Sequence, residues 1–314
     1  MRKTSLDLVY QLAKQDSRVL FIGSDLGIGT LDNFKAEMPD RFFMEGVSEM
    51  NIVGMAAGLA LEGKIVYVNT IATFLTRRCF EQNVLDLGLH NVPVRLIASG
   101  GGVVYAPLGP THLAIDDLAI MRAIPNMTIV APCDAEEMKR LMPQTVDYPG
   151  PIYIRLGKGG DPIVSSPGNP FQIGKAITMT TGDDALLITT GITLKIGLDA
   201  AAALRARGIA CTVLHMHTVK PLDLEALVAH VTRVPVVVTI EEHTIVGGLG
   251  GAVAEVIAEG GFSPAKRFKR IGLPDVFPRG YGSQANMMAR YDITPDRVMA
   301  VVDELRAPTP ARAS

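Results

Sequence analysis

One acidic residue, Glu49, stands at the start of an apolar segment rich in small side chains. It is the only charged residue between Glu45 and Glu62, and residues 50–61 contain the glycines and alanines of a helix that packs closely against its neighbours. Burial among apolar side chains favours the neutral form of a carboxyl group, which can then donate a proton to a ring nitrogen. The helix dipole also favours an acid in a first turn, so a purely structural role is the alternative.

Two further positions have side chains suited to catalysis or substrate binding. His112 lies in a Pro-Thr-His turn, where an imidazole can donate a hydrogen bond or move a proton near neutral pH. Arg155 ends an apolar run, and its planar guanidinium suits a phosphate or carboxylate, with Lys158 able to share that role. The structural alternatives are a histidine that only holds its turn and an arginine at the surface end of a strand.

His215 and His217 are two residues apart and therefore lie on one face of an expected strand. A pair of imidazoles can ligate a metal, but no third ligand is evident in the sequence, and we expect a structural role. The three cysteines, Cys79, Cys133 and Cys211, show no metal-binding or redox spacing. We therefore expect no metal bound by this chain itself, and a reducing, cytoplasmic location.

Strand-like and helix-like segments alternate along the first half of the chain. Apolar and β-branched runs predict the strands, and the longer segments between them predict the helices. The expected strands are 19–24, 64–70, 94–99, 128–132 and 152–156, and the expected helices are 49–61, 73–89, 116–123 and 135–146. This alternation predicts an α/β fold with a mostly parallel sheet and helices on both faces.

A second α/β unit follows a segment rich in proline, glycine and serine. Its strands are expected at 185–190, 211–216, 235–241 and 268–272, and its helices at 193–207, 224–231, 247–259 and 295–306. We predict a first domain at 1–164, a linker at 165–172, a second domain at 173–307 and a disordered tail at 308–314. Open α/β sheets bind ligands beyond the carboxyl ends of their strands, which is where Asp25, Glu49 and the glycine-rich loop 100–111 fall.

Composition narrows the class of function. The 314 residues are 48% apolar, enough for two cores, and 30 basic residues nearly balance 32 acidic ones to give a net charge of −2. This balance gives no sign of nucleic-acid binding, and no apolar run approaches the ~20 residues of a membrane span. An acidic residue soon after Met1 also argues against a signal peptide.

Several segments resemble motifs of the transketolase family of thiamine-diphosphate enzymes. Residues 46–60 resemble the family's G-I-x-E-x-x-M segment, and Thr-Phe-Leu-Thr-Arg-Arg-Cys-Phe-Glu-Gln at 73–82 resembles the helix that covers the cofactor's aminopyrimidine. Gly-Pro-Thr-His at 109–112, Ile-Pro-Asn-Met at 124–127 and Ala-Pro-Cys-Asp at 131–134 follow in the family's order, and 219–223 and 241–250 resemble its C-terminal domain. The resemblance therefore covers both expected domains and implies the family's fold for each of them.

This resemblance implies roles for individual residues. Thiamine diphosphate reacts through a carbanion at C2 of its thiazolium ring, and the protein must activate the aminopyrimidine. Glu49 is then the acid that donates to the pyrimidine nitrogen, and His112 points to the oxygen atoms of the substrate. The implied cofactor-binding residues are Asp25, Glu49, Phe74, Arg77 and Phe80, and the implied substrate-binding residues are His112, Arg155 and Lys158.

The family holds the diphosphate and its magnesium ion with a Gly-Asp-Gly that is followed later in the chain by an Asn, and this sequence lacks that pair. Gly182-Asp183-Asp184 is among the nearest matches, and it has no suitable Asn downstream. The chain, with its own Met1, thus resembles the C-terminal half of a split transketolase. The resemblance implies thiamine diphosphate and Mg²⁺ as cofactors, Mg²⁺ held by a separate N-terminal subunit, and an α2β2 assembly.

Three positions depart from the family's pattern for sugar phosphates. Leu108 stands where many members carry an aspartate that contacts a substrate hydroxyl, Gly100 where they carry a phosphate-binding histidine, and Gly29 near a serine of the same subsite. A charge-assisted hydrogen bond contributes roughly 1.5–3 kcal/mol, so we expect a differently substituted sugar in place of the usual pentose phosphates. The β subunit of a 2-oxoacid dehydrogenase E1, a 1-deoxyxylulose-5-phosphate synthase-like subunit and a non-catalytic assembly subunit remain as alternatives.

Overall fold

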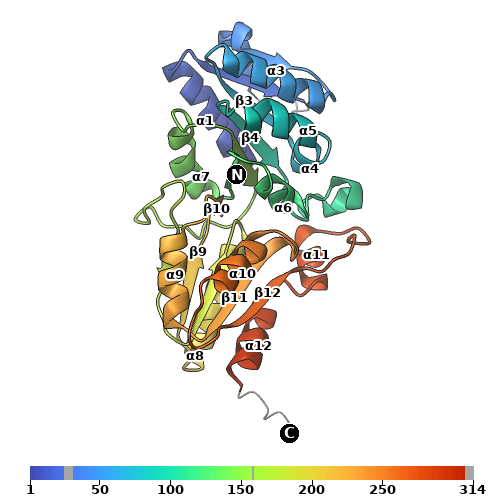
Figure 1. The fold of residues 1–314 in the computed structure, drawn as a ribbon. Coiled ribbons are helices and arrows are strands. Elements are labelled where there is room, and N and C mark those ends of the chain that lie inside the picture. Colours follow the sequence, from blue (N-terminus) through green and yellow to red (C-terminus); the bar gives the residue numbers. More distant parts are fainter. Residues whose placement is uncertain (25–30, 158, 308–314) are drawn as a thin grey trace.

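The computed structural model describes residues 1–24, 31–157 and 159–307 of the chain. Predictions that concern Asp25, Gly29, Lys158 and the tail 308–314 therefore lie outside the described residues. The described residues form two α/β units stacked end to end, with the first half of the chain at the top of Figure 1 and the second half below it.

The first unit is built on a seven-stranded sheet with the order β10-β5-β6-β4-β3-β1-β2. Its strands are β1 (Val19–Gly23), β2 (Phe42–Met44), β3 (Ile65–Ile71), β4 (Val94–Ser99), β5 (Thr128–Val130), β6 (Ile152–Leu156) and β10 (Thr218–Lys220). All neighbours are parallel except β10, which pairs antiparallel with β5. Since β10 comes from the second half of the chain, the second unit completes the sheet of the first.

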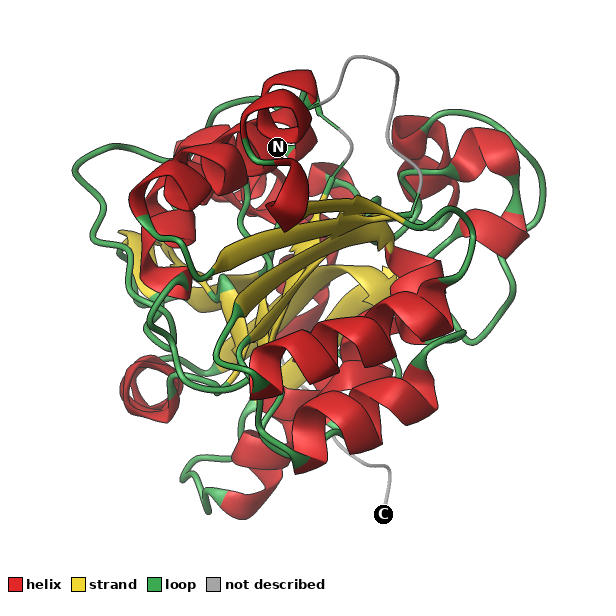
Figure 2. Cartoon of the chain, turned by 90° about the horizontal axis from the view of Figure 1, so that it is seen from above, coloured by secondary structure: helices red, strands yellow, loops and turns green. Residues whose placement is uncertain are grey.

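Helices cover both faces of this sheet because successive strand residues point to opposite sides. Val66 and Val68 of β3 join one core with helices α3, α4 and α6, whereas Ile65 and Tyr67 join another core with α1 and α7. These helices are α1 (Arg2–Gln15), α3 (Glu49–Leu61), α4 (Ala72–Thr76), α6 (Asp117–Arg122) and α7 (Ala135–Leu141), and a short α2 spans Asp32–Glu37. Figure 2 shows helices on either side of the strands.

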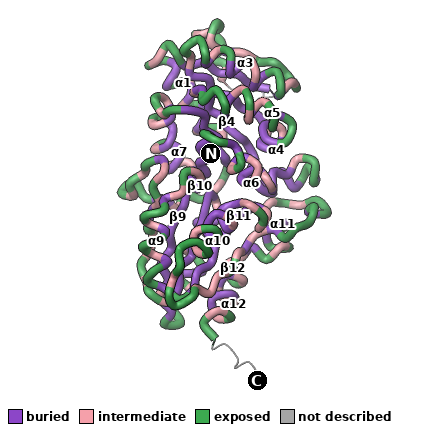
Figure 3. Tube along the Cα trace, in the orientation of Figure 1, coloured by how far each residue is buried: buried purple, intermediate pink, exposed green. Residues whose placement is uncertain are grey.

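The second unit has a five-stranded sheet with the order β12-β11-β8-β9-β7, in which only β7 is antiparallel to its neighbour. Its strands are β7 (Ile177–Thr180), β8 (Ala185–Thr189), β9 (Cys211–His215), β11 (Val236–Thr244) and β12 (Arg267–Leu273). Its helices are α8 (Thr193–Ala206), α9 (Leu224–Arg233), α10 (Leu249–Glu259), α11 (Gln284–Arg290) and α12 (Pro295–Arg306). Two cores lie on its two faces, and the buried strands run through both units in Figure 3. The predicted α/β fold with mostly parallel sheets is confirmed.

The helix predicted over 73–89 is wrong in one respect, because it is interrupted. Helix α4 stops at Thr76, a turn follows, and the chain resumes as α5 (Phe80–Gln82) and a π-helical turn at Asn83–Leu89. The Cys79 thiol lies 3.2 Å from the Phe74 carbonyl, and Asn83 Nδ2 donates to the Leu75 carbonyl at 2.7 Å. Side chains thus satisfy carbonyl oxygens at the end of α4, where the backbone ladder stops.

Candidate active site

Glu49 lies at the carboxyl ends of β1 and β3, two adjacent strands of the first sheet. It opens α3 as predicted, and the residue is only 1% exposed. Its Oε1 accepts a hydrogen bond from Ser24 Oγ at 3.2 Å, and that hydroxyl is 3.0 Å from Thr70 Oγ1. Since Ser24 follows β1 and Thr70 is in β3, two adjacent strands position the carboxylate at the edge where such sheets bind ligands.

The other oxygen of Glu49 is held by a residue that sequence reasoning missed. Arg78 Nη1 donates to Glu49 Oε2 at 2.5 Å, and Arg78 Cζ lies 4.4 Å from the centroid of the Phe74 ring. Arg78 is the middle residue of the turn that follows α4 and interrupts the predicted helix. The structure thus links the predicted acid and the predicted stacking residue through one planar cation.

His112 completes this group from the loop after β4. Its ring centroid is 5.4 Å from that of Phe74, with the planes at 68°, and its Nδ1 lies 2.9 Å from Thr111 Oγ1. Both Phe74 and His112 are half-buried, so neither is a core side chain. The structure therefore brings together Glu49, Phe74 and His112, as the sequence predicts.

The other two residues of the predicted cofactor helix make different contacts. Arg77 donates three hydrogen bonds of 2.8–3.0 Å to the carboxylate of Asp116, immediately before α6. Phe80 lies at the start of α5 and is exposed. The guanidinium over Phe74 thus belongs to Arg78, the residue after the predicted one.

Arg155 is placed differently from its predicted position at the substrate. It is 5% exposed, its Nε donates to Asp117 Oδ2 at 2.7 Å, and its Nη2 donates to the Glu242 carbonyl at 2.8 Å. Burial alone would lower the pKa of this guanidinium, but the adjacent Asp117 carboxylate raises that pKa overall. As placed, Arg155 joins β6, α6 and β11, so the geometry favours a structural role over the predicted contact with substrate.

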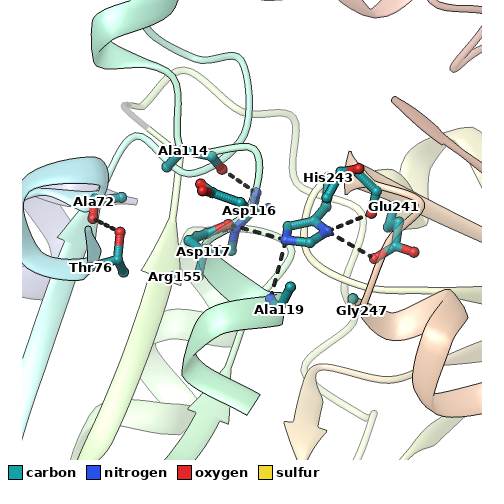
Figure 4. Close-up of polar contacts among 12 residues, drawn as sticks. Ala72, Thr76, Ala114, Asp116, Asp117, Ala119, Arg155, Glu241, His243 and Gly247 are labelled. Atoms are coloured by element: carbon teal, nitrogen blue, oxygen red, sulfur yellow. Dashed lines mark hydrogen bonds and ion pairs between the residues drawn. The ribbon is translucent and has the colours of Figure 1, made fainter. Parts of the chain in front are cut away.

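His243 belongs to the same junction and not to an open site. Figure 4 shows it between Asp117 and Ala119 of α6 and Glu241 of β11. The Ala119 N–H donates to Nε2 at 3.3 Å, and Nδ1 lies 2.7 Å from the Thr244 carbonyl, which places the ring proton on Nδ1. These contacts describe a fully buried histidine that connects the two units.

In the loop after β4, two glycines lie where a larger residue would collide with a neighbouring side chain. Gly100 has a φ of +77°, and a Cβ there would lie 2.0 Å from the ring of Tyr105. Gly102 lies against the side chain of Glu242. The Glu242 carboxylate accepts a hydrogen bond from the Val103 N–H at 2.8 Å. Burial raises the pKa of Glu242 to about 7. Tyr105 therefore takes the space of a side chain at position 100, a compensation that the sequence alone does not reveal.

His215 and His217 are both buried, but only His215 lies in a strand, β9, and His217 lies in the bend between β9 and β10. His215 Nε2 is 3.2 Å from Glu137 Oε2, and Cys133 completes a cluster whose possible ligand atoms lie within 4.8 Å of one another. His217 instead stacks on Phe171, with ring centroids 4.0 Å apart. Burial opposes ionisation of Glu137, but the nearby histidines lower its pKa to about 2. The contact between Glu137 and His215 connects α7 with β9.

Across the residues that the structure describes, no helix is both long and apolar enough to cross a membrane. Several exposed apolar side chains lie on or beside α3 and the π-helical turn. They are Val47, Met50, Leu61, Leu85 and Leu89. Leu108, which is 51% exposed, precedes Gly109, and the ring of Tyr281 lies against Gly109.

Known proteins match this chain along most of its length. The sequence profile of the transketolase pyrimidine-binding domain matches residues 1–160, and that of the transketolase C-terminal domain matches 174–298. The 6-deoxy-6-sulfo-D-fructose transketolase subunit of Clostridium sp. (strain MSTE9) is 34% identical over 92% of each chain. One of the subunits of the apulose-4-phosphate transketolase of Phocaeicola vulgatus is 37% identical over 87% of each chain.

Solved structures agree with these matches. A split-gene transketolase, described as an inactive β4 tetramer, superimposes with a TM-score of 0.88 at 35% identity over 97% of each chain. The transketolase of Campylobacter jejuni shares the fold alone, with a TM-score of 0.80 at 16% identity. The 1-deoxy-D-xylulose-5-phosphate synthase of Gloeobacter violaceus is 36% identical, and the match covers 96% of this chain and 48% of that enzyme. The chain therefore belongs to the transketolase family of thiamine-diphosphate-dependent enzymes, with the pyrimidine-binding domain followed by the C-terminal domain.

Proposed function

We propose that this chain is the C-terminal subunit of a transketolase that moves a two-carbon ketol unit from a ketose to an aldose. The observation that carries the proposal is the buried Glu49 carboxylate beside Phe74 and His112 at the carboxyl ends of β1 and β3. Relatives of nearly equal length named as transketolase subunits support it. The predicted domain boundaries, 1–164 and 173–307, are part of this proposal.

The residues present fit the aminopyrimidine end of thiamine diphosphate. A buried carboxyl group and an aromatic face lie close enough for one planar nitrogen-bearing group, the Arg78 guanidinium, to contact both. When bound, the cofactor supplies the nucleophilic carbon that attacks the ketose. In this proposal Glu49 holds a proton and donates it to the pyrimidine nitrogen, while Phe74 supports the ring.

His112 acts on the substrate side of the site. Its ring lies edge-on to that of Phe74, and an imidazole can donate a hydrogen bond to a substrate oxygen or move a proton there. Arg77 and Phe80 remain proposed cofactor neighbours, and Asp25 and Lys158 remain proposed on the sequence motifs alone. For Arg155 the buried pair with Asp117 favours support of the site, with no direct contact with substrate.

A partner subunit supplies the motif for the diphosphate and Mg²⁺ that this sequence lacks. We propose that an N-terminal chain holds the diphosphate and Mg²⁺, and that two copies of each chain form an α2β2 assembly. The exposed apolar side chains around α3 support a large interface, because obligate contacts of about 2,000 Å² or more are rich in such groups. The β4 assembly of the similar split-gene chain, described as inactive, agrees with a requirement for a partner.

Three free, buried cysteines agree with a reducing cytoplasm.

The substrate we propose is a ketose whose distal end differs from that of the usual pentose phosphates. Leu108 is exposed beside His112 and cannot accept a hydrogen bond, and the ring of Tyr105 fills the space over Gly100. Two relatives are named as transketolase subunits for 6-deoxy-6-sulfo-D-fructose and for apulose 4-phosphate, and these names support a departure of this kind.

Product analysis separates this function from the synthase alternative, which the 36% identity to 1-deoxy-D-xylulose-5-phosphate synthases keeps open. The chain is mixed with its N-terminal partner, cofactor and Mg²⁺ and given a panel of ketoses, or pyruvate, with an aldose phosphate. A transketolase shortens the ketose by two carbons without releasing CO₂. Release of CO₂ from pyruvate with formation of a 1-deoxyketose would overturn the proposal in favour of the synthase.

A further inference from the structure

Arg78 is the least expected residue of the site, and its two contacts are unusually placed. Its guanidinium donates to Glu49 Oε2 at 2.5 Å while lying 4.4 Å from the centroid of the Phe74 ring. The Arg78 side chain is 38% exposed, whereas Glu49 is almost fully buried. The arginine thus enters the site from the solvent side and ends on the buried acid.

In the proposed function, Glu49 and Phe74 are the two residues that bind the aminopyrimidine of the cofactor. The pyrimidine nitrogen needs the Glu49 carboxyl group, and the pyrimidine ring needs the face of Phe74. A planar guanidinium stacks on aromatic faces and donates in its own plane, so it satisfies both groups as a flat heterocycle would. The guanidinium and the ring cannot occupy this place together.

We propose that Arg78 is an internal plug, which fills the aminopyrimidine position of the cofactor-free protein and must swing outward when thiamine diphosphate binds. This inference rests on the proposed function, because it uses the roles assigned there to Glu49 and Phe74. The turn at Arg77–Cys79 gives the side chain room to move, since Arg77 is anchored separately to Asp116 and Arg78 is already partly in solvent.

The two contacts of Glu49 use different forms of its carboxyl group. The ion pair with the Arg78 guanidinium is made by the carboxylate. To donate to the pyrimidine nitrogen it must carry a proton, while Arg78 remains a cation and enters solvent. One proton is therefore taken from the buffer for each cofactor bound, and no other bond is made or broken.

Other titratable groups surround this pair. Burial and the Glu49 charge raise the pKa of the Cys79 thiol to about 12, so this group stays neutral in the measured range. Arg77 and Asp116 form their own ion pair next to α6. His112, which contacts Phe74, carries another ionisable side chain of the site and needs its own control.

Calorimetric titration of thiamine diphosphate with Mg²⁺ into the complex of both subunits tests the plug. At pH 8, titrations in buffers of different ionisation enthalpy give the number of protons taken up. The natural complex should take up close to one proton per site. Arg78→Met should bind the cofactor about tenfold more tightly or better, in line with the loss of one charge-assisted hydrogen bond. Its proton uptake should fall, because cofactor binding then breaks no ion pair with the Glu49 carboxylate.

Three variants make the result specific. Arg78→Lys keeps the charge and should keep most of the proton uptake. Arg18→Met removes an arginine from a surface pair with Asp16 before the start of β1, and should leave both affinity and uptake unchanged. His112→Asn should keep the uptake, and uptake that disappears in this variant but persists in Arg78→Met would assign the proton to the histidine and overturn the plug.

The same titrations distinguish failure of the plug from failure of the proposed function. Weaker binding by Arg78→Met, or affinity and uptake equal to those of the natural complex, would overturn the plug while the proposed role of Glu49 stands. If Glu49→Gln also binds the cofactor and turns over like the natural complex, the proposed role of Glu49 fails as well, and the plug with it.

Discussion

At the scale of single residues, the account depends most on the buried carboxyl group of Glu49. Replacing it with Gln keeps the shape of the side chain and removes the acid, so the subunit should fold and assemble normally. General acid–base contributions are typically ~10²–10⁴-fold, and we expect kcat of the reconstituted enzyme to fall by about that factor. Steady-state kinetics with matched circular dichroism spectra measure this. Near-normal turnover would reduce Glu49 to a structural acid at the start of α3.

Leu108 provides the second test at this scale, because it is exposed beside His112 and can be changed without disturbing a core. Leu108→Asp restores the hydroxyl-binding group of the family's usual pattern. We expect kcat/KM to rise for unsubstituted ketose phosphates relative to the preferred donor, by about tenfold for one hydrogen bond to a charged group. Leu108→Asn is the uncharged control. If xylulose 5-phosphate is already the best donor and the ranking does not change, the inferred specificity is wrong.

Residue types and motifs predict the residues at the centre of the site better than the residues that hold them in place. Glu49, Phe74 and His112 are found together because each follows a local pattern that fixes its place near a strand end. Arg78 has no such pattern, since its contact with Glu49 depends on where α4 stops. Arg155 looks like a strand-end cation in the sequence, and its burial depends on contacts distant in the chain, with Asp117 of α6 and with β11 of the other unit.

At the scale of elements, local patterns predict some boundaries well. Strands β4 and β6 and helices α3 and α12 match the predicted residues, because each is a continuous apolar run or is bounded by a clear start or end signal. Strand β10 and helix α11 depend on packing between units and have no distinctive period of their own. The break after α4 likewise depends on side-chain hydrogen bonds from Cys79 and Asn83 that propensity does not report.

The Arg155–Asp117 pair gives a prediction at this scale, because it connects β6 with α6. Removing one partner of a buried pair typically costs about 3–5 kcal/mol, so Arg155→Met should lower the free energy of unfolding by that amount. The double variant Arg155→Met, Asp117→Leu should recover part of the loss. Urea unfolding followed by circular dichroism measures both. Unchanged stability together with a raised KM for a phosphorylated ketose would show that Arg155 binds substrate after all.

At the scale of the whole molecule, buried polar groups join the two units and make stability depend on pH. Burial lowers the pKa of His217 from about 6.5 to about 3, despite the opposing attraction of Glu137. The folded protein therefore holds this ring neutral, and its contribution is complete above pH 6.5 and is lost as pH falls from 6.5 towards 3. At ~1.4 kcal/mol per pH unit, the loss from this group by pH 5 is about 2 kcal/mol.

His217→Phe keeps an aromatic ring on Phe171 but cannot take up a proton. We expect the variant to lose about 2 kcal/mol less stability than the natural chain between pH 7.5 and pH 5, as measured by urea unfolding at both values. His90→Phe, in an exposed loop, is the matched control and should keep the natural slope. An identical pH dependence in the His217 variant would show that this ring is not held neutral in the folded state.

The central claim is that this chain carries one half of a thiamine-diphosphate active site, and turnover of the separate and combined subunits tests it most directly. Transfer of a two-carbon unit is measured with the purified chain alone, with the N-terminal subunit alone and with the mixture, each with thiamine diphosphate and Mg²⁺. The account predicts turnover only in the mixture, abolished by chelation of Mg²⁺ or by omission of the cofactor. Robust turnover by the purified chain alone would contradict it.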